Sequence, residues 1–465
     1  MLFTSQVFLY YFLPLFLALY YLSPNRLRTA LLAVASYVFY GWWRPDFVLL
    51  MWVSTIVDFT AGKKIAAARE RGEKGKPWLL VSLCLNLGLL GFFKYANFGI
   101  DTANEILRSL GYAQVEWTRV ILPVGISFYT FQTLSYSVDV YRGIAPPVRS
   151  FRDFACYVAM FPQLVAGPIV RYNTVAEQLH SRTHTWAKFS AGVLAFQAGL
   201  AKKVLLADVL GELADAAFKN TATLGTQDAW LGTLAYTFQI YFDFSGYSDM
   251  AIGLGLMLGF RMPINFDQPY RSVDITDFWR RWHISLSTFL RDYLYIPLGG
   301  NRKGPLRTYV NLALTMLLGG LWHGAAWTFV AWGGYQGFWL ILERRFGKRG
   351  LWGTAPYPAR IAITFVVAMF GWVLFRAGSM TDAWQVTSAM CGFGGDAVSG
   401  SVPSVRNIHL LAFAAGAVVL WAFPTTQALL RRLPSWWVWV LQPLFLWALI
   451  HLHYEEHVPF LYFQF

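Results

Sequence analysis

The sequence predicts an all-α polytopic membrane protein with roughly ten to fourteen membrane helices, several of them short or re-entrant. Hydrophobic residues make up 56% of the 465 residues, and charged residues make up only 14%. Uncharged runs recur along the whole chain, at 2–25, 29–43, 77–93, 120–138, 154–170, 308–342, 361–375, 408–430 and 434–454. Helices are expected, because a helix satisfies its backbone hydrogen bonds within one segment.

Length and composition of these runs predict individual elements. The run 2–25 has no basic segment before it and no small-residue cleavage pattern after it, which indicates a retained helix. The run 308–342 is too long for one crossing, since about 20 apolar residues span a bilayer, so it predicts two segments. Shorter runs at 229–242 and 250–260 predict further or broken helices. No polar segment is long enough for a separate aqueous domain, which predicts one membrane-embedded unit over 1–465.

The formal net charge of +13 predicts orientation and not nucleic-acid binding, because polytopic proteins concentrate Lys and Arg in cytoplasmic loops. One short loop is strongly basic and is therefore expected to be cytoplasmic; its cations are Lys63, Lys64, Arg69, Arg71, Lys74 and Lys76. Counting back through two crossings places Arg26 and Arg28 on the cytoplasmic side as well.

The interval 261–307 is the longest polar-rich stretch and is also expected to face the cytoplasm. Apolar residues recur at steps of three and four from Ile275 to Tyr293, which predicts one amphipathic helix capped by Asp274. His283 follows Trp279 by four residues and is expected on the apolar face.

His323 is the candidate catalytic residue, because it is the one histidine within the uncharged run 308–342, and an ionisable group at such depth in a membrane segment indicates function. It lies near the predicted junction of the two segments. Apolar surroundings favour the neutral imidazole, which can act as a general base. The alternative is a structural histidine hydrogen-bonded to a neighbouring helix.

For several other polar residues, the sequence allows both a functional and a structural interpretation. His283 could line the entrance of a path to His323, or be an interfacial residue like its tryptophan neighbours. Arg280 and Arg281 could bind phosphates of a soluble donor or anchor the interface, and an Asp277–Arg281 pair is the simpler explanation for Arg281. Asp243 and Asp249 could bind substrate, or serve as structural groups paired with a cation from elsewhere.

Several site classes are not predicted. The residues His451, His453, Glu455, Glu456 and His457 resemble metal ligands in composition, but their spacing matches no zinc motif, so no metal site is expected. Walker, GxSxG, HExxH and dinucleotide motifs are absent from the sequence.

Several motifs together resemble the membrane-bound O-acyltransferase family, and within it the members that acetylate bacterial alginate, peptidoglycan and cellulose. The motifs are Trp-Arg-Arg-Trp-His at 279–283, Leu-Gly-Gly-Asn-Arg at 298–302, Leu-Trp-His-Gly at 321–324, and the segments 92–98, 122–128, 241–249 and 459–465. The likeness covers nearly the whole chain.

The resemblance implies a multi-pass enzyme of the bacterial inner membrane, with its helices around a central funnel or tunnel. It implies an acyl thioester co-substrate such as acetyl-CoA, no bound cofactor, and an extracytoplasmic polysaccharide acceptor, with alginate first and peptidoglycan or cellulose next. A periplasmic acetyltransferase of the serine-hydrolase-like type is the implied partner. His323 matches the catalytic histidine and His283 the second one, with Trp322 shaping the path and Arg280, Arg281 or Arg302 near the donor.

Two rival functions stay open at this point. A transporter of an acylated lipid or saccharide would use His323 to carry or sense protons. A non-catalytic scaffold of a polysaccharide-modifying complex would work without either histidine.

Overall fold

The computed structural model describes residues 1–347, 351–394, 404–432, 435–454 and 460–461. Helices are the only regular structure in these ranges, in agreement with the predicted all-α class. Residues 455–457 of the metal-like group and 462–465 of the last family-like motif lie outside the described residues. The chain divides into two compact units, Met1–Gly192 with Ala251–Pro263, and Val193–Met250 with Ile264–Phe465.

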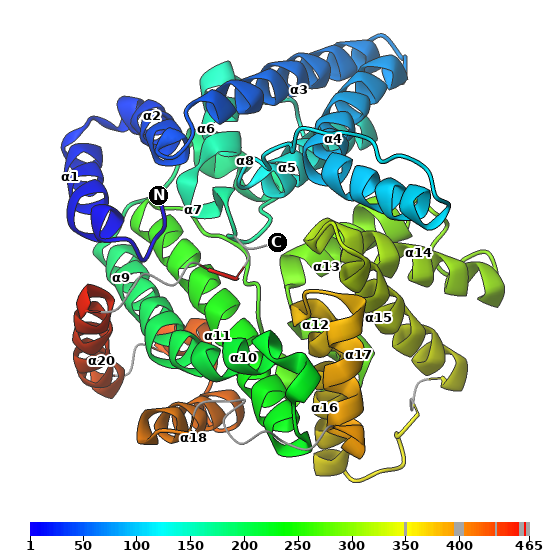
Figure 1. Ribbon diagram of the computed structural model, residues 1–465. Coiled ribbons are helices and arrows are strands. Elements are labelled where there is room, and N and C mark those ends of the chain that lie inside the picture. Colours follow the sequence, from blue (N-terminus) through cyan, green and yellow to red (C-terminus); the bar gives the residue numbers. More distant parts are fainter. Residues whose placement is uncertain (348–350, 395–403, 433–434, 455–459, 462–465) are drawn as a thin grey trace. The chain divides into compact units, whose positions relative to one another are not determined.

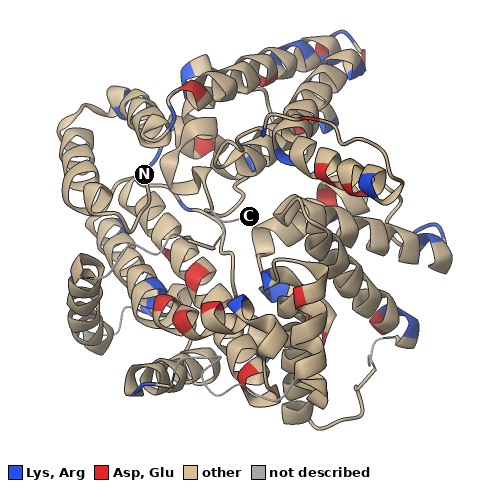
Figure 2. Ribbon diagram, viewed as in Figure 1, with Lys and Arg blue, Asp and Glu red and all other residues tan. Residues whose placement is uncertain are grey.

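The first unit is built from helices of the amino-terminal half of the chain (Figure 1). Its elements are η1 (Val7–Phe12), α1 (Leu13–Leu22), α2 (Asn25–Gly41), α3 (Asp46–Glu70), α4 (Lys76–Ser109), α5 (Ile126–Arg142), α6 (Phe151–Ala159), α7 (Phe161–Leu164) and α8 (Tyr172–His180). Lys and Arg gather where α3 meets α4, at the loop predicted to be cytoplasmic, and long stretches of helix carry no charge (Figure 2).

The second unit holds most of the carboxy-terminal helices. Its elements are η2 (Lys202–Asp208), α10 (Val209–Lys219), η3 (Thr221–Thr223), η4 (Pro269–Arg271), α12 (Ile275–Arg281), α13 (Ile284–Leu290), η5 (Arg291–Tyr295), α14 (Pro305–His323), α15 (Trp327–Phe346), α16 (Tyr357–Arg376), α17 (Met380–Ser388), η6 (Ala389–Phe393), α18 (Asn407–Trp421), α19 (Thr426–Arg432) and α20 (Ser435–Tyr454). The boundary between the units falls within α9 (Trp186–Ala201) and within α11 (Thr226–Met257).

Helices suited to a membrane are present, as the apolar runs predict. Among the described residues, α4 and α16 are each long enough and apolar enough to cross a bilayer, judged by length and composition. The pair α18 and α19 passes the same criteria together but bends by 65° at the break, which fits a broken span or a re-entrant loop. The range of ten to fourteen membrane helices and the central funnel stay predictions.

The uncharged run 308–342 forms two helices, α14 and α15, as its length predicts. The two helices lie side by side as a hairpin (Figure 1). Glycines allow this approach, because a side chain at Gly320 would meet the carbonyl oxygen of Phe329, and one at Gly333 would meet that of Met316. Gly320 and Gly333 therefore serve the close packing of the two helices.

The prediction of one amphipathic helix from Ile275 to Tyr293 is wrong. The segment forms two seven-residue helices, α12 and α13, separated at Trp282 and His283. The break follows from the backbone of His283, which has φ +44° and so leaves the right-handed helical region. The predicted cap is confirmed: the Asp274 side chain accepts a hydrogen bond from the Asp277 amide at 2.6 Å.

Candidate functional site

His323 is the last residue of α14, at the predicted junction between the two segments of the run. Its side chain is buried, with 5% of its surface exposed. The chain turns directly after it, and Gly324 is needed there because a side chain at that position would collide with the Phe329 ring. The carboxyl end of a helix carries partial negative charge, so α14 presents an environment that favours positive charge near His323.

His283 occupies the turn between α12 and α13, and its side chain is completely buried. The two flanking helices are too short to span a membrane. Burial lowers the pKa of His283 to about 3, so its imidazole is neutral at physiological pH. The His283 side chain is buried away from water, as predicted, but it projects from a turn and not from the apolar face of a helix. A left-handed backbone at a residue other than glycine is uncommon and concentrates at functional sites.

Asn265 holds the turn at His283 in place. Its backbone oxygen accepts from the Ile284 amide at 2.9 Å, and its side-chain Oδ1 accepts from the Ser285 amide at 3.2 Å and from Ser285 Oγ at 2.9 Å. Its Nδ2 donates to Ser248 Oγ at 3.2 Å. The sequence did not single out Asn265, and its one available signal was a polar residue between apolar neighbours just before the 275–290 segment.

The two imidazoles lie close together inside a shell of aromatic rings. The ring centroids of His283 and His323 are 6.3 Å apart, and the Trp322 ring lies 6.1 Å from His283 and 5.0 Å from His323. Phe244 lies edge-on to His283 at 4.7 Å, and Trp332 and Phe375 lie edge-on to His323 at 5.1 and 5.2 Å. The structure therefore brings together three predicted site residues: His283, Trp322 and His323.

Helix α12, which leads into His283, is fastened to α15, which follows His323. The buried Glu343 carboxylate accepts from the amides of Ile275 at 2.6 Å and Thr276 at 2.9 Å, at the amino end of α12. Trp279 Nε1 donates to Gln336 Oε1 at 3.2 Å. These contacts fix the two histidine-bearing segments relative to each other.

The predicted donor-binding arginines differ in how they are held. Arg281 pairs with Asp277, with Nε and Oδ1 3.0 Å apart, as the spacing of four residues predicts. Arg280 and Arg302 are exposed at the surface. Of the three, Arg280 and Arg302 are thus better placed to meet a soluble ligand.

Asp243 and Asp249 lie on α11 and are buried, and each forms an ion pair with a lysine of η2. Lys203 Nζ lies 3.1 Å from Asp243 Oδ1 and also pairs with Asp208, and Asp243 Oδ2 accepts from the Leu461 amide at 3.1 Å. Lys202 Nζ donates to Asp249 Oδ2 at 2.7 Å. These contacts favour the structural alternative for both aspartates.

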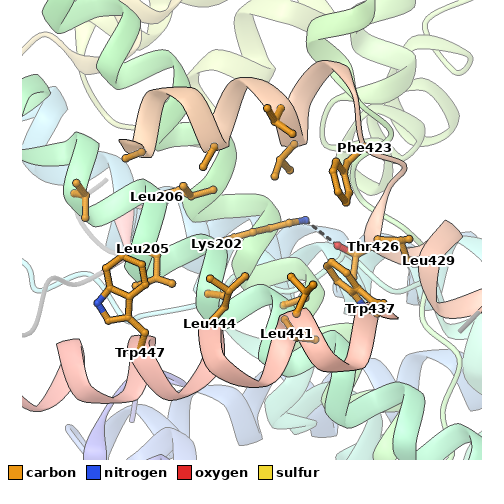
Figure 3. A pocket seen from close by; sticks show the side chains of 18 of the residues that line it. Lys202, Leu205, Leu206, Phe423, Thr426, Leu429, Trp437, Leu441, Leu444 and Trp447 are labelled. Carbon is orange, nitrogen blue, oxygen red and sulfur yellow. Dashed lines mark hydrogen bonds between the residues drawn. The ribbon is translucent and has the colours of Figure 1, made fainter. Parts of the chain in front are cut away.

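A cavity of about 300 Å³ lies beside Lys202 and is lined mostly by aliphatic and aromatic side chains. Figure 3 shows Lys202 reaching toward Thr426, with Leu206 on one side and Leu441 and Leu444 on the other. The Lys202 Nζ to Thr426 Oγ1 distance is 2.8 Å. Neither His283 nor His323 lines this cavity, so it is a feature separate from the pair that these two histidines form.

Two neighbouring imidazoles in an aromatic shell, of which burial keeps His283 neutral, can accept and donate protons while bulk water is kept away. Within the described ranges, no group of three or more His, Cys, Asp or Glu side chains is placed to hold a metal ion. The arrangement suits deprotonation of a hydroxyl nucleophile beside a reactive carbonyl.

Comparison with known proteins agrees with this chemistry. Residues 144–377, which include both histidines, match the model of the membrane-bound O-acyltransferase family. A Pseudomonas aeruginosa protein named "Probable alginate O-acetylase AlgI" is 51% identical over 424 residues, 90% of this chain and 80% of the relative. An Azotobacter vinelandii protein of the same name is 54% identical over 394 residues, 85% of this chain and 79% of the relative. The peptidoglycan O-acetyltransferase of Helicobacter pylori is 37% identical over 429 residues, 85% of this chain and 80% of the relative.

Proposed function

The chain belongs to the membrane-bound O-acyltransferase family, and from this premise we propose that it passes an acetyl group from a cytoplasmic thioester, acetyl-CoA, across the bacterial inner membrane for O-acetylation of an extracytoplasmic polysaccharide. The protein is a membrane O-acyltransferase by family and by its apolar helices. Alginate is the proposed acceptor, because relatives that are 51% and 54% identical carry alginate in their names. Peptidoglycan, from the 37% identical relative, is the second choice, and cellulose the third.

The pair of buried imidazoles is the observation that carries this proposal. His323 takes the proton of the acceptor hydroxyl as its oxygen attacks the thioester carbonyl. A carbon–oxygen bond forms, the carbon–sulfur bond breaks, and the proton passes from His323 to the departing thiolate. The carboxyl end of α14 stabilises the imidazolium that exists between these two proton transfers.

The remaining predicted residues have supporting roles in this proposal. His283 lies on the donor side and, being neutral, acts by hydrogen bonding and not by charge. Trp322 contacts both imidazoles and shapes the space between them. Arg280 and Arg302 meet the donor's phosphates, since guanidinium groups bind phosphate oxygens in a bidentate fashion.

The proposal also assigns roles to segments of the chain and includes a partner protein. Residues 1–465 act as one membrane-embedded catalytic unit, with 261–307 at the cytoplasmic face and 308–342 carrying the catalytic histidine. A periplasmic acetyltransferase of the serine-hydrolase-like type accepts the acetyl group and places it on the polymer.

Donor and direction can be tested in sealed membrane vesicles that contain the protein. Labelled acetyl-CoA supplied to the cytoplasmic face should yield label on an acceptor at the opposite face, and the same donor supplied at the opposite face should not. Equal transfer from both faces would contradict the direction. Movement of an intact substrate without acyl transfer would favour the transporter.

The acceptor can be tested in cells. Mass spectrometry of surface polymers from a deletion strain should show loss of acetyl groups from alginate, restored by the wild-type gene and not by His323→Ala. Restoration by His323→Ala would support the scaffold function instead. Loss confined to peptidoglycan or cellulose would reassign the acceptor.

A further inference from the structure

Four nitrogen-bearing side chains, here called the basic cluster, meet in the first unit: Arg28 of α2, Arg182 and His184 of the loop after α8, and Lys188 of α9. Arg182 and His184 hydrogen-bond to the hydroxyl of Tyr20, Lys188 reaches the Gly259 carbonyl, and Arg28 contacts His184. Arg182 Nε donates to Tyr20 Oη at 3.0 Å, and its guanidinium lies 4.6 Å from the Phe260 ring centre. Lys188 Nζ donates to the Thr183 carbonyl at 3.0 Å.

Hydrogen bonding sets the protonation state of His184. Arg28 NH1 lies 3.3 Å from His184 Nδ1, and because arginine has no acceptor, Nδ1 must accept. His184 Nε2 then carries the proton and donates to Tyr20 Oη at 3.0 Å, while Tyr20 donates to the Leu258 carbonyl at 3.0 Å. Burial, Arg28 and Arg182 lower the pKa of His184 to about 4, in agreement with a neutral ring.

The positive charge of the cluster is not balanced by acidic side chains. None of the ion pairs formed within the described ranges involves Arg28, Arg182 or Lys188, whose hydrogen bonds go to neutral oxygens and to His184. The two lysines of η2, in contrast, each have a carboxylate partner. Three cations packed around neutral acceptors repel one another, and an anion would relieve that repulsion.

Aromatic side chains continue from the cluster to the surface. Tyr21 lies beside His184 at 5.8 Å and beside Phe189 at 5.7 Å, and Phe189 contacts Trp186 at 6.1 Å. Trp186 is 84% exposed. Exposed tryptophan and tyrosine beside Lys and Arg is the composition of a membrane interface, where the rings lie at the level of lipid headgroups.

We propose that the basic cluster binds the phosphate of an anionic phospholipid of the cytoplasmic leaflet. Arg28 and Lys188 supply charge, Arg182 supplies charge and holds Tyr20, and the Tyr21–Phe189–Trp186 rings contact the glycerol and upper acyl region. The cytoplasmic leaflet has a negative surface potential that attracts basic side chains, and Arg28 is predicted to lie on that side. This assignment is independent of the proposed catalytic roles of His283 and His323.

The test uses the purified full-length protein in detergent, with phosphatidylglycerol or phosphatidylcholine added and binding read by native mass spectrometry. The wild type should retain phosphatidylglycerol in preference to phosphatidylcholine. Arg28→Gln with Lys188→Gln should weaken phosphatidylglycerol binding by about 25-fold, since each lost charge near the headgroup accounts for about fivefold. Equal retention of the two lipids by the wild type would overturn the proposal.

Matched variants separate a local site from general electrostatics and from misfolding. Lys74→Gln with Lys76→Gln removes the same charge from exposed positions of the basic loop and should change the affinity by no more than about twofold, because distant exposed charges are screened. Arg182→Lys keeps the charge, so it should keep the lipid preference even if its melting temperature falls. Equal losses in the two double variants would overturn the site. Displacement of phosphatidylglycerol by millimolar inorganic phosphate would overturn the lipid assignment in favour of a soluble phosphate.

Discussion

The lysines of η2 and the histidines at 283 and 323 all place ionisable groups inside the second unit, but they are neutralised by different means. Lys202 and Lys203 are charged, and carboxylates on η2 and α11 balance them. His283 and His323 lie among aromatic rings, and burial keeps His283 uncharged. A fully paired charge is committed to structure, whereas a neutral imidazole can still gain a proton. Functional protonation is therefore expected at His323, the proposed base, and not at the lysines.

The largest expected effect concerns the charged region. Lys203→Ala should lower the free energy of unfolding by about 3–5 kcal/mol, because it leaves the buried carboxylate of Asp243 without this cation and also removes the Lys203–Asp208 ion pair. Lys219→Ala, at the exposed end of the adjoining α10, should change it by less than about 0.5 kcal/mol. Thermal unfolding in detergent measures both changes. A Lys203→Ala protein as stable as the Lys219→Ala protein would contradict the claim that the ion pairs of η2 stabilise the fold.

A second effect, of intermediate size, concerns the pH dependence of stability. The pKa of His283 is about 3 in the folded protein and 6.5 ordinarily, so below pH 6.5 the unfolded chain binds a proton that the folded protein does not. Stability is then lost as pH falls from about 6.5 toward 3, by about 2 kcal/mol at pH 5. His283→Gln should abolish this component of acid destabilisation, and His180→Gln, at an exposed position, should preserve it. Melting curves recorded at pH 8 and pH 5 measure this component. If the melting temperatures of the two variants fall by the same amount between these pH values, His283 is not buried in neutral form.

The smallest expected effect concerns the support of the histidine turn. Asn265→Ala removes the side-chain acceptor for Ser285 and should lower kcat about tenfold with little change in the donor KM, because a displaced His283 impairs orientation. Asn311→Ala is the control: Asn311 is equally buried and donates to the Gly300 carbonyl at 2.9 Å, near the far end of α14. Steady-state kinetics with both variants show whether the fall in kcat is specific to Asn265. An equal fall in kcat in the two variants would contradict a particular role of Asn265 in positioning His283.

Several features of the fold could be predicted from the length of uncharged runs and from local residue spacing. The uncharged run 308–342 exceeds one span, so its division into α14 and α15 at His323 could be predicted from length alone. The cap at Asp274 and the Asp277–Arg281 pair follow from local spacing. Such features depend on residues that are continuous or close together in the sequence.

Features that depend on distant residues could not be predicted. Three- and four-residue periodicity continues through His283, but the hydrogen bonds from 284 and 285 to Asn265 and the left-handed backbone break the helix there. Asp243 and Asp249 clearly needed cations, yet the lysines that supply them lie 40 and 47 residues earlier, on η2. The 6.3 Å spacing of the imidazoles likewise arises from tertiary packing between α12, α13 and the α14–α15 hairpin.

The central claim is that His323 acts as the base of acyl transfer while the ion pairs of η2 hold the structure. The most direct test is acetyl transfer from acetyl-CoA by purified wild type and His323→Ala, with melting temperatures measured on the same samples. We expect the variant to melt as a folded protein and to transfer acetyl about 10²–10⁴-fold more slowly, the contribution typical of a positioned general base. Transfer within tenfold of the wild-type rate by the folded variant would contradict the claim.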